Sequence, residues 1–281
     1  MKYSLYYILW LLLVINATTF GQPSRIITAG SSSSEIVCAL GFCDKIVATD
    51  RTSLYPEKLQ ALPSIGYRSG VNAEGIVSLT PDLVIIEKGY VKEDVIAQIQ
   101  STGIKVVAVD HEATFESTKI RIRSIAEAVN KKTEGEALIT KIEQQLTEVA
   151  KKVTNNPSRP TVLCVYARGA GSMQVAGKNT SFGLLPLAGT VNAVPDIDGY
   201  KPLNAESLIQ ANPDYILFFT SGLESIGGIE GALKITGVEQ TTAGKKKQMI
   251  HMDGILLTNW GPRVAQAAEE LFYLTHPEAK K

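Results

Sequence analysis

A loop that contains Tyr67 carries the residue types best suited to metal chemistry in this chain. Gly66 and Gly70 stand on either side of the Tyr67-Arg68 pair, so the backbone there is open. A tyrosine phenolate is a hard anionic donor that suits ferric iron, including haem iron. The neighbouring Arg68 would favour the ionised phenolate, because a nearby positive charge stabilises it. From these residues alone, an aromatic side chain packed in a lobe or placed at its rim is the more common explanation for Tyr67.

Other side chains that could do chemistry are scarce. The sequence contains no GxSxG, HExxH or P-loop motif. His111 follows an expected strand and could reach a cleft, although a structural role is more common for a lone histidine. His251 lies in an expected strand, and we expect His276, near the C-terminus, to be exposed. The missing catalytic constellation argues against an enzyme.

Serines and cysteines near the start of the chain leave two questions open. Residues 31–34 are four serines at an expected strand-to-helix turn, where their N–H groups could bind an anion or their hydroxyls could cap the helix. Cys38 and Cys164 lie in apolar patterns that are typical of small buried residues. Cys43 lies in a turn, so a local disulfide with Cys38 is possible, whereas no Cys/His spacing suits zinc.

The elements that must position these residues form a repeating strand–helix pattern. We expect strands at residues 25–29, 45–49, 83–86, 106–109, 161–166, 215–219 and 249–251. We expect helices at residues 34–39, 74–79, 93–101, 182–187, 205–210 and 264–273. This alternation predicts α/β lobes with a mostly parallel sheet.

The middle of the chain is expected to be helical. Residues 117–129 and 134–153 have few turn residues, and the second segment repeats apolar side chains at helical spacing. A helix of about 20 residues would span roughly 30 Å. The sequence therefore predicts an N-terminal α/β lobe at residues 22–112, bridging helices at residues 113–156 and a C-terminal α/β lobe at residues 157–281.

An internal repeat indicates that the two lobes are similar. Residues 72–85 and 204–217 each read Asn-Ala-Glu, then a helix, Pro-Asp and a strand. Glu74 and Glu206 would stand at equivalent helix starts. Complementing the helix dipole explains either glutamate alone but does not explain the matched pair.

The first 21 residues have the pattern of a secretory signal peptide. Lys2 precedes an apolar stretch at residues 5–15 and a polar, small-residue exit. We expect cleavage after Gly21, with Ala17 as the alternative position. The apolar stretch is short for a membrane span, although a retained anchor is the competing interpretation. The charges balance at 28 basic and 28 acidic residues, so the sequence predicts no nucleic-acid binding.

Several motifs resemble the haemin-binding periplasmic proteins of bacterial haem-uptake ABC transporters. The wider group includes cobalamin- and ferric-siderophore-binding proteins, and the resemblance extends over roughly residues 25–274. The motifs that carry it are at residues 52–56, 66–67, 73–75, 175–180, 199–203, 222–228 and 261–263. The segments 222–228 and 261–263 are similar to the haemin branch specifically.

The resemblance implies a class III periplasmic binding protein, with two similar α/β lobes bridged by a single long α-helix and little hinge closure. It implies that Tyr67 ligates haem iron and that Glu74 and Glu206 dock on the membrane permease of an ABC importer. Relatives often have an arginine two positions after the tyrosine, where this chain has Ser69. Support for the phenolate is therefore expected from Arg68 or Arg263. The other expected haem-pocket residues are Tyr90, Arg168 and Trp260.

Some relatives supply a histidine from the second lobe, but this chain has none between residues 161 and 200. Met173 and Tyr166 are the candidates to replace it, and the sequence favours one five-coordinate haem. We predict a monomeric, non-enzymatic carrier in the periplasm that delivers haemin, as transported ligand, to an ABC importer. The alternative is the same fold binding cobalamin or a ferric siderophore.

Overall fold

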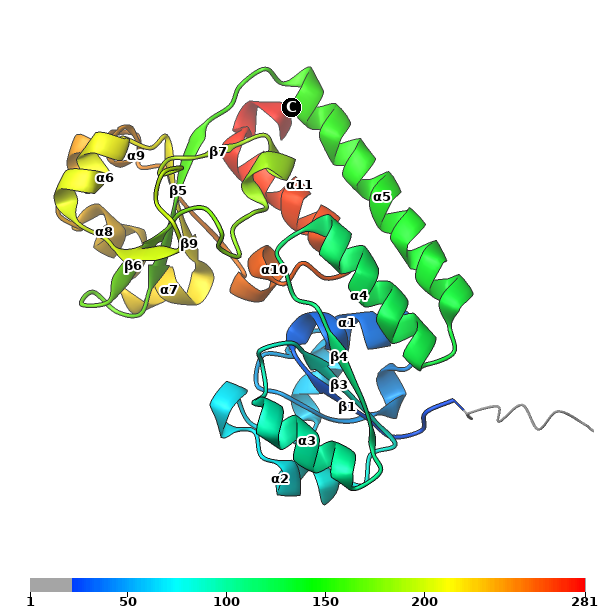
Figure 1. Cartoon of the computed structure of the whole chain (residues 1–281). Coiled ribbons are helices and arrows are strands. Elements are labelled where there is room, and N and C mark those ends of the chain that lie inside the picture. The colour runs from blue at the N-terminus through cyan, green and yellow to red at the C-terminus, as the bar shows by residue number, and fades with distance from the viewer. Residues whose placement is uncertain (1–21, 281) are drawn as a thin grey trace, which may run out of the picture.

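Two α/β lobes joined by helices make up the structure, a computed structural model that describes residues 22–280 (Figure 1). The expected signal peptide, residues 1–21, lies outside the described residues. None of the helices between residues 22 and 280 is long and apolar enough to cross a membrane. All seven expected strands are confirmed, and each lies within one residue of its expected bounds.

The first lobe has a parallel sheet in the order β2-β1-β3-β4. Its strands are β1 (Ile26–Ala29), β2 (Ile46–Thr49), β3 (Leu83–Glu87) and β4 (Lys105–Val109). Its helices are α1 (Ser31–Ala39), α2 (Ala73–Val77) and α3 (Glu93–Ser101). Parallel neighbours require crossover connections, and the helices on both faces bury β1 and β3 along their whole lengths.

The second lobe has a mixed sheet in the order β10-β9-β5-β6-β8, with β7 beside β5. The strands are β5 (Thr161–Ala167), β6 (Met173–Ala176), β7 (Val191–Asn192), β8 (Tyr200–Pro202), β9 (Tyr215–Phe219) and β10 (Met249–Met252). Strands β6 and β8 pair antiparallel, so the expectation of a mostly parallel sheet is confirmed in full only for the first lobe. Both strands are short, and each has exposed residues, which gave them no clear apolar run in the sequence.

Short helices surround this second sheet. They are α6 (Ala205–Ala211), α7 (Thr220–Ser225), α8 (Gly228–Leu233), α9 (Thr242–Lys245), α10 (Gly254–Thr258) and the longer α11 (Val264–Thr275). Single 3-10 turns lie at Cys43–Lys45, Glu57–Ala61, Arg68–Gly70, Leu185–Ala188, Val238–Gln240 and Pro277–Lys280. The helix expected at residues 182–187 is wrong. Pro186 and the left-handed Gly189 limit that segment to one 3-10 turn.

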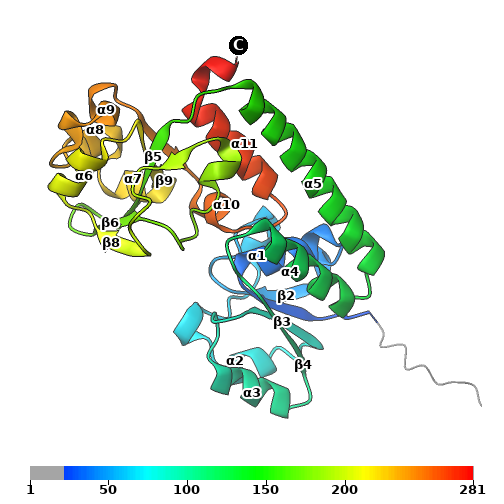
Figure 2. The same cartoon turned by 45° about the horizontal axis from the view of Figure 1, so that its top comes forward.

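The bridge consists of α4 (Phe115–Ala128) and α5 (Lys132–Asn155). Helix α5 has 24 residues and is therefore about 36 Å long. It runs beside α4 at the first lobe and beside α11 at the second (Figures 1 and 2). Gly135 lets α4 and α5 approach closely, because a Cβ at that position would lie 2.6 Å from the Cβ of Ala126.

A second connection joins the lobes directly, and we call it the interlobe seam: Ser31, Ser32, Glu35, Thr118, Arg121, Asn259, Trp260 and Arg263. Arg263 donates to both carboxyl oxygens of Glu35, at 2.9 and 2.5 Å. The side-chain amide of Asn259 donates to Glu35 at 3.0 Å. The fully buried Arg121 donates to the carbonyl of Trp260 at 3.0 Å. Side chains of the first lobe and the bridge thus fix a loop of the second lobe.

The sequence repeat corresponds to equivalent local structures in the two lobes. Asn72 and Asn204 cap α2 and α6, and each accepts from the backbone N–H three residues later at 2.8 Å. Asp82 in the first lobe accepts hydrogen bonds from the backbone N–H and the hydroxyl of Ser24, each at 2.8 Å. Asp214 in the second lobe accepts in the same way from Thr161, the first residue of β5, also at 2.8 Å. The expectation of two similar lobes is confirmed at this level.

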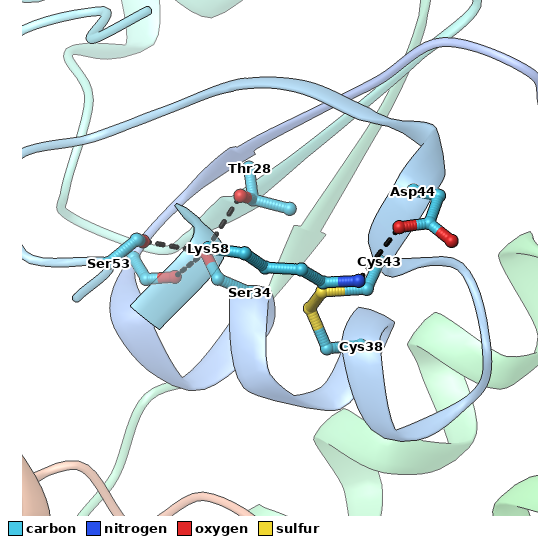
Figure 3. The surroundings of a disulfide bond; sticks show 8 residues. Thr28, Ser34, Cys38, Cys43, Asp44, Ser53 and Lys58 are labelled. Carbon is cyan, nitrogen blue, oxygen red and sulfur yellow. Dashed lines mark hydrogen bonds and ion pairs between the residues drawn. A yellow bond between two sulfur atoms is a disulfide. The ribbon is translucent and has the colours of Figure 1, made fainter. Parts of the chain in front are cut away.

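The structure corrects the expectations for Cys38 and His276. Cys38 and Cys43 form a disulfide that joins α1 to the following turn, close to the Lys58–Asp44 ion pair (Figure 3). Cys38 is therefore half-buried in a disulfide and is not the lone buried thiol that its pattern indicated, whereas Cys164 is a buried thiol with a pKa raised by burial. His276 is fully buried, so the expectation of exposure was wrong. In the turn after α11, the imidazole ring of His276 stacks on the ring of Phe272, with 4.6 Å between the ring centroids.

We predict that Arg263→Ala destabilises the folded protein by about 2–4 kcal/mol, because it leaves the buried Glu35 carboxylate without its cation. Urea unfolding at neutral pH measures this change in the free energy of unfolding. The matched control is Lys151→Ala, which breaks an exposed pair with Glu148 and should cause no measurable change. Equal stabilities of the Arg263 variant and the unsubstituted protein would contradict this account of the interlobe seam.

Candidate functional site

A cleft of about 670 Å³ lies between the lobes and is lined by residues of both. Many of its lining residues follow the carboxyl ends of strands: Glu87 to Tyr90 at β3, His111 after β4, Arg168 after β5 and Asp253 after β10. This is the edge at which open α/β sheets bind ligands. A second cavity of about 710 Å³ adjoins the cleft, and Arg68, His111 and Thr258 line both.

Tyr67 projects into this cleft from the loop between β2 and α2. Its side chain is 41% exposed, and its hydroxyl oxygen accepts a hydrogen bond from Nε of Arg68 at 3.0 Å. Arg68 adopts a left-handed backbone conformation, with φ of 46°, at the start of a 3-10 turn. The local fold therefore places a guanidinium against the phenol oxygen, a contact that would stabilise negative charge on that oxygen.

Tyr90 lies next to Tyr67, but its hydroxyl faces a carboxylate and not a guanidinium. The two rings meet edge to face at 6.0 Å between centroids, and the guanidinium of Arg68 lies 5.5 Å from the centre of each ring. The hydroxyl of Tyr90 donates to the carboxylate of the buried Asp50. Burial, and then this hydrogen bond, raise the pKa of Tyr90. Tyr90 therefore stays a neutral phenol and can serve as a wall of the cleft beneath Arg68.

The opposite wall presents a second tyrosine–arginine pair. Nε of Arg168 donates to the hydroxyl oxygen of Tyr166 at 2.7 Å, and its guanidinium lies 5.0 Å from the ring centre. Both side chains line the cleft at the carboxyl end of β5. From the sequence, Arg168 is expected only as a pocket residue, and Tyr166 as one of two substitutes for a second-lobe histidine. The spacing of Tyr166 and Arg168, a tyrosine with an arginine two positions later, is the signal that could have identified the pair.

Three other candidates lie outside this cleft. Met173, the other possible substitute, lines a separate cavity of about 420 Å³ in the second lobe. Arg263 belongs to the interlobe seam, and its guanidinium stacks on Tyr55 at 3.8 Å from the ring centre. Trp260 is buried, donates to the carbonyl of Ser181 at 3.2 Å and lines the adjoining 710 Å³ cavity. Arg68, and not Arg263, is thus the arginine that contacts the Tyr67 hydroxyl.

The N-terminus of α1 binds an anion that belongs to the protein itself. The backbone N–H of Ser33 donates to the carboxyl of Glu87 at 2.9 Å, and no serine hydroxyl caps the helix. Gly30 permits this approach, because a Cβ there would lie 2.1 Å from the Glu87 carboxyl carbon. The anion-binding interpretation of the four serines is therefore confirmed, with a buried glutamate of the same chain as the anion, whereas the capping interpretation was wrong.

His111 reaches the cleft, as the sequence allowed. Its Nδ1 lies 3.1 Å from Oε2 of Glu87. Burial raises the pKa of Glu87 to about 7. Burial, followed by the charges of Arg121 and Arg68, lowers the pKa of His111 to about 4. The imidazole is therefore neutral at physiological pH, beside a carboxyl that changes its protonation state there.

Glu74 and Glu206 are exposed residues in the first turns of α2 and α6. These helices lie at the outer ends of the two lobes (Figures 1 and 2). The structure thus brings Tyr67, Arg68, Tyr90 and Arg168 into one cleft and places the two glutamates away from it, on equivalent surfaces.

Comparison with known proteins identifies relatives over nearly the whole chain. The family described as periplasmic binding protein matches residues 26–256. The periplasmic heme-binding protein RhuT from Roseiflexus sp. RS-1 is 35% identical, with a TM-score of 0.86 over 91% of this chain and 99% of its own. The periplasmic heme-binding protein BhuT, solved in complex with two hemes, is 30% identical, with a TM-score of 0.86 over 92% of this chain and 100% of its own.

Two curated relatives come from Bacillus subtilis. The ABC transporter substrate-binding lipoprotein YvrC is 26% identical over 92% of this chain and 82% of its own length. The Fe(3+)-citrate-binding protein YfmC is 28% identical over 73% of this chain and 65% of its own length. Solved structures of the heme-binding protein HmuT, 28% and 27% identical, include a Tyr→Ala variant and an Arg→Ala variant two positions further along. The family and these relatives are binding proteins rather than enzymes.

Proposed function

We propose that this chain, which belongs to the periplasmic binding protein family, captures haemin between its lobes and delivers it to an ABC importer. The observation that carries the proposal is the pair of tyrosine–arginine contacts on opposite walls of one cleft. The similarity to RhuT and BhuT, which are heme-binding proteins, supports it.

The chemistry of the cleft suits an iron that a porphyrin already chelates. Four porphyrin nitrogens leave only axial positions open, and a single tyrosinate oxygen can fill one of them. A guanidinium that donates to the same oxygen stabilises its negative charge. Apolar lining side chains such as Leu54, Phe219 and Ile255 can cover the flat macrocycle.

Tyr166 changes the expected stoichiometry. The two variants of HmuT have the spacing of Tyr166 and Arg168, and BhuT was solved with two hemes. The sequence favoured one five-coordinate haem because the second lobe lacks a histidine. With a tyrosine–arginine pair on each wall, we propose that the cleft accepts up to two haemins, with one iron on Tyr67 and one on Tyr166.

We predict that Tyr67→Phe and Tyr166→Phe each lower the bound haemin from two per chain to one, because each removes one iron ligand and keeps the ring. The double variant should lose the tyrosine–iron charge-transfer absorption altogether. Absorbance titration with haemin measures both effects, and Tyr55→Phe, outside the cleft, is the matched control. An unchanged spectrum in the double variant would exclude these ligands.

The main alternative is that the same fold binds a different metal complex, such as cobalamin or a ferric siderophore. YfmC, which binds ferric citrate, keeps this alternative open. Parallel titrations with cyanocobalamin and ferric citrate separate the two proposals. Tighter binding of either compound than of haemin would replace haemin as the transported ligand.

We propose export to the periplasm through residues 1–21, a first lobe at residues 22–112, a bridge at residues 113–156 and a second lobe at residues 157–281. The carrier acts as a monomer, catalyses no reaction and binds no nucleic acid. Glu74 and Glu206 would contact basic pockets on the permease, since they are exposed at equivalent places on the two lobes.

We expect Glu74→Gln/Glu206→Gln to reduce haem uptake by about tenfold or more in cells that contain the importer, because charge pairs at an interface stabilise the complex. Haemin affinity of the purified protein should not change. The matched control is Glu93→Gln/Glu230→Gln, which alters exposed first-turn glutamates on α3 and α8. If both double variants support equal uptake, the docking assignment is wrong.

A further inference from the structure

His111 offers the cleft a free imidazole nitrogen. It lines both the 670 Å³ cleft and the adjoining cavity, and its side chain is 40% exposed. Nδ1 contacts Glu87, whose side chain is 4% exposed and is itself bound by the N–H of Ser33. Nε2 has no hydrogen-bond partner among residues 22–280. The buried carboxyl thus lies beside Nδ1, and Nε2 is left for a ligand in the cleft.

The charges around His111 favour an anion beside it. Arg121 from α4 and Arg68 from the Tyr67 loop both act on the imidazole. The side-chain hydrogen bonds of Arg121 go to carbonyl and hydroxyl oxygens, all of them neutral. A ligand carboxylate near Nε2 would thus meet the guanidinium of Arg68, which lines both cavities, as well as the imidazole. Arg121 is fully buried and would act on the ligand only through its charge.

Carboxyl groups also surround the Glu87–His111 pair. Asp50, after β2, acts on Glu87 and favours its protonated form. Asp110, next to His111, pairs with Lys88 at 2.8 Å, so these two charges offset one another. The pair therefore has a carboxyl that is ready to take up a proton, and the exposed guanidinium of Arg68 near it would attract an anion.

We propose that Nε2 of His111 donates a hydrogen bond to a carboxylate of the bound porphyrin, and that the Glu87–His111 pair takes up one proton to do so. This inference rests on the proposed function, since it concerns the propionate groups of haemin in the same cleft.

The protons balance in one step. While Glu87 is ionised, the proton of the neutral imidazole lies on Nδ1, which is 3.1 Å from Oε2 of Glu87, and Nε2 presents a lone pair that repels a propionate. After uptake of one proton from solvent, the carboxyl O–H of Glu87 donates to Nδ1, and Nε2 carries the hydrogen. The hydrogen on Nε2 can then bond the propionate, and no other covalent bond changes.

The sign of the pH dependence follows from this uptake. The pKa of Glu87 is about 7, so the pair already has the proton below that pH and must acquire it above. Porphyrin affinity should therefore fall as pH rises above about 7, by up to about tenfold per pH unit for one proton.

The test uses iron-free protoporphyrin IX, because ligation of iron by a tyrosine would add its own release of a proton. Affinity is measured by quenching of protein fluorescence between about pH 6.5 and pH 9, a range in which the ordinary groups of Asp, Glu and Lys do not titrate. Protoporphyrin IX dimethyl ester is the matched ligand without carboxylates. The variants are His111→Phe and Glu87→Gln, with His251→Phe, an exposed histidine of β10, as control.

We expect the affinity of the unsubstituted protein and of the His251 variant for the free acid to fall with pH, and affinity for the diester to stay constant. His111→Phe should bind the free acid with no such slope. Glu87→Gln keeps an amide donor to Nδ1, so its affinity at high pH should match that of the unsubstituted protein at low pH. This second variant tests the proton uptake independently of whether His111→Phe folds.

The inference is overturned if the slope persists in both variants or is equally steep for the diester. Affinity that rises with pH and requires His111 would indicate a lone pair acting as an acceptor or metal ligand, and would also overturn it. Haemin spectra recorded alongside distinguish failure of the proposed haemin binding from failure of the proposed proton uptake. Loss of the tyrosine–iron band in the unsubstituted protein contradicts the proposed function, whereas a normal band with identical slopes contradicts this inference alone.

Discussion

The hydrogen bond from an arginine Nε to a tyrosine oxygen is the interaction on which the cleft depends. It occurs once on each lobe, at 3.0 Å for Tyr67 and 2.7 Å for Tyr166. A phenol becomes an iron ligand only after losing its proton, and an adjacent guanidinium stabilises the resulting charge. Tyr90, only 6.0 Å from Tyr67 between ring centres, faces a carboxylate instead and stays neutral. The hydroxyls of two adjacent tyrosines thus have partners of opposite charge.

The rest of the fold sets the positions of the two walls. Parallel strands carry the lining residues to the cleft edge, and α5 connects the lobes over about 36 Å. The interlobe seam adds a second, polar connection, in which Glu35, Asn259 and Arg263 are bonded across the lobes. Because there are two separate connections, we expect little independent motion of the lobes. They also explain why Arg263 is part of the frame of the cleft rather than its lining.

The sequence predicted elements well wherever apolar periodicity or local motifs determine structure. Strands such as residues 215–219 and the capped repeat at Asn72 and Asn204 depend on neighbours in sequence. The placement of Tyr67 in an open loop depended on flanking glycines. The short strands β6 and β8 lack an apolar run, and the pairing of β6 with β5 and of β8 with β6 determines them.

Residues whose role depends on distant partners could not be predicted in this way. Arg263 has its role because Glu35, 228 positions away, is its partner. His276 is buried because the end of α11 folds back against Ser158 and Phe272. Glu87 reaches the N-terminus of α1 only through the pairing of β1 with β3. Tyr166 could have been preferred to Met173 from the sequence, since its spacing to Arg168 is visible there.

A structure of the haemin-loaded protein tests the central claim most directly. The account predicts iron bonded to the oxygen of Tyr67, and at saturation a second iron bonded to the oxygen of Tyr166. Arg68 and Arg168 should still donate to those oxygens. Iron bonded to any other side chain, or a porphyrin bound outside the cleft between the lobes, would contradict it.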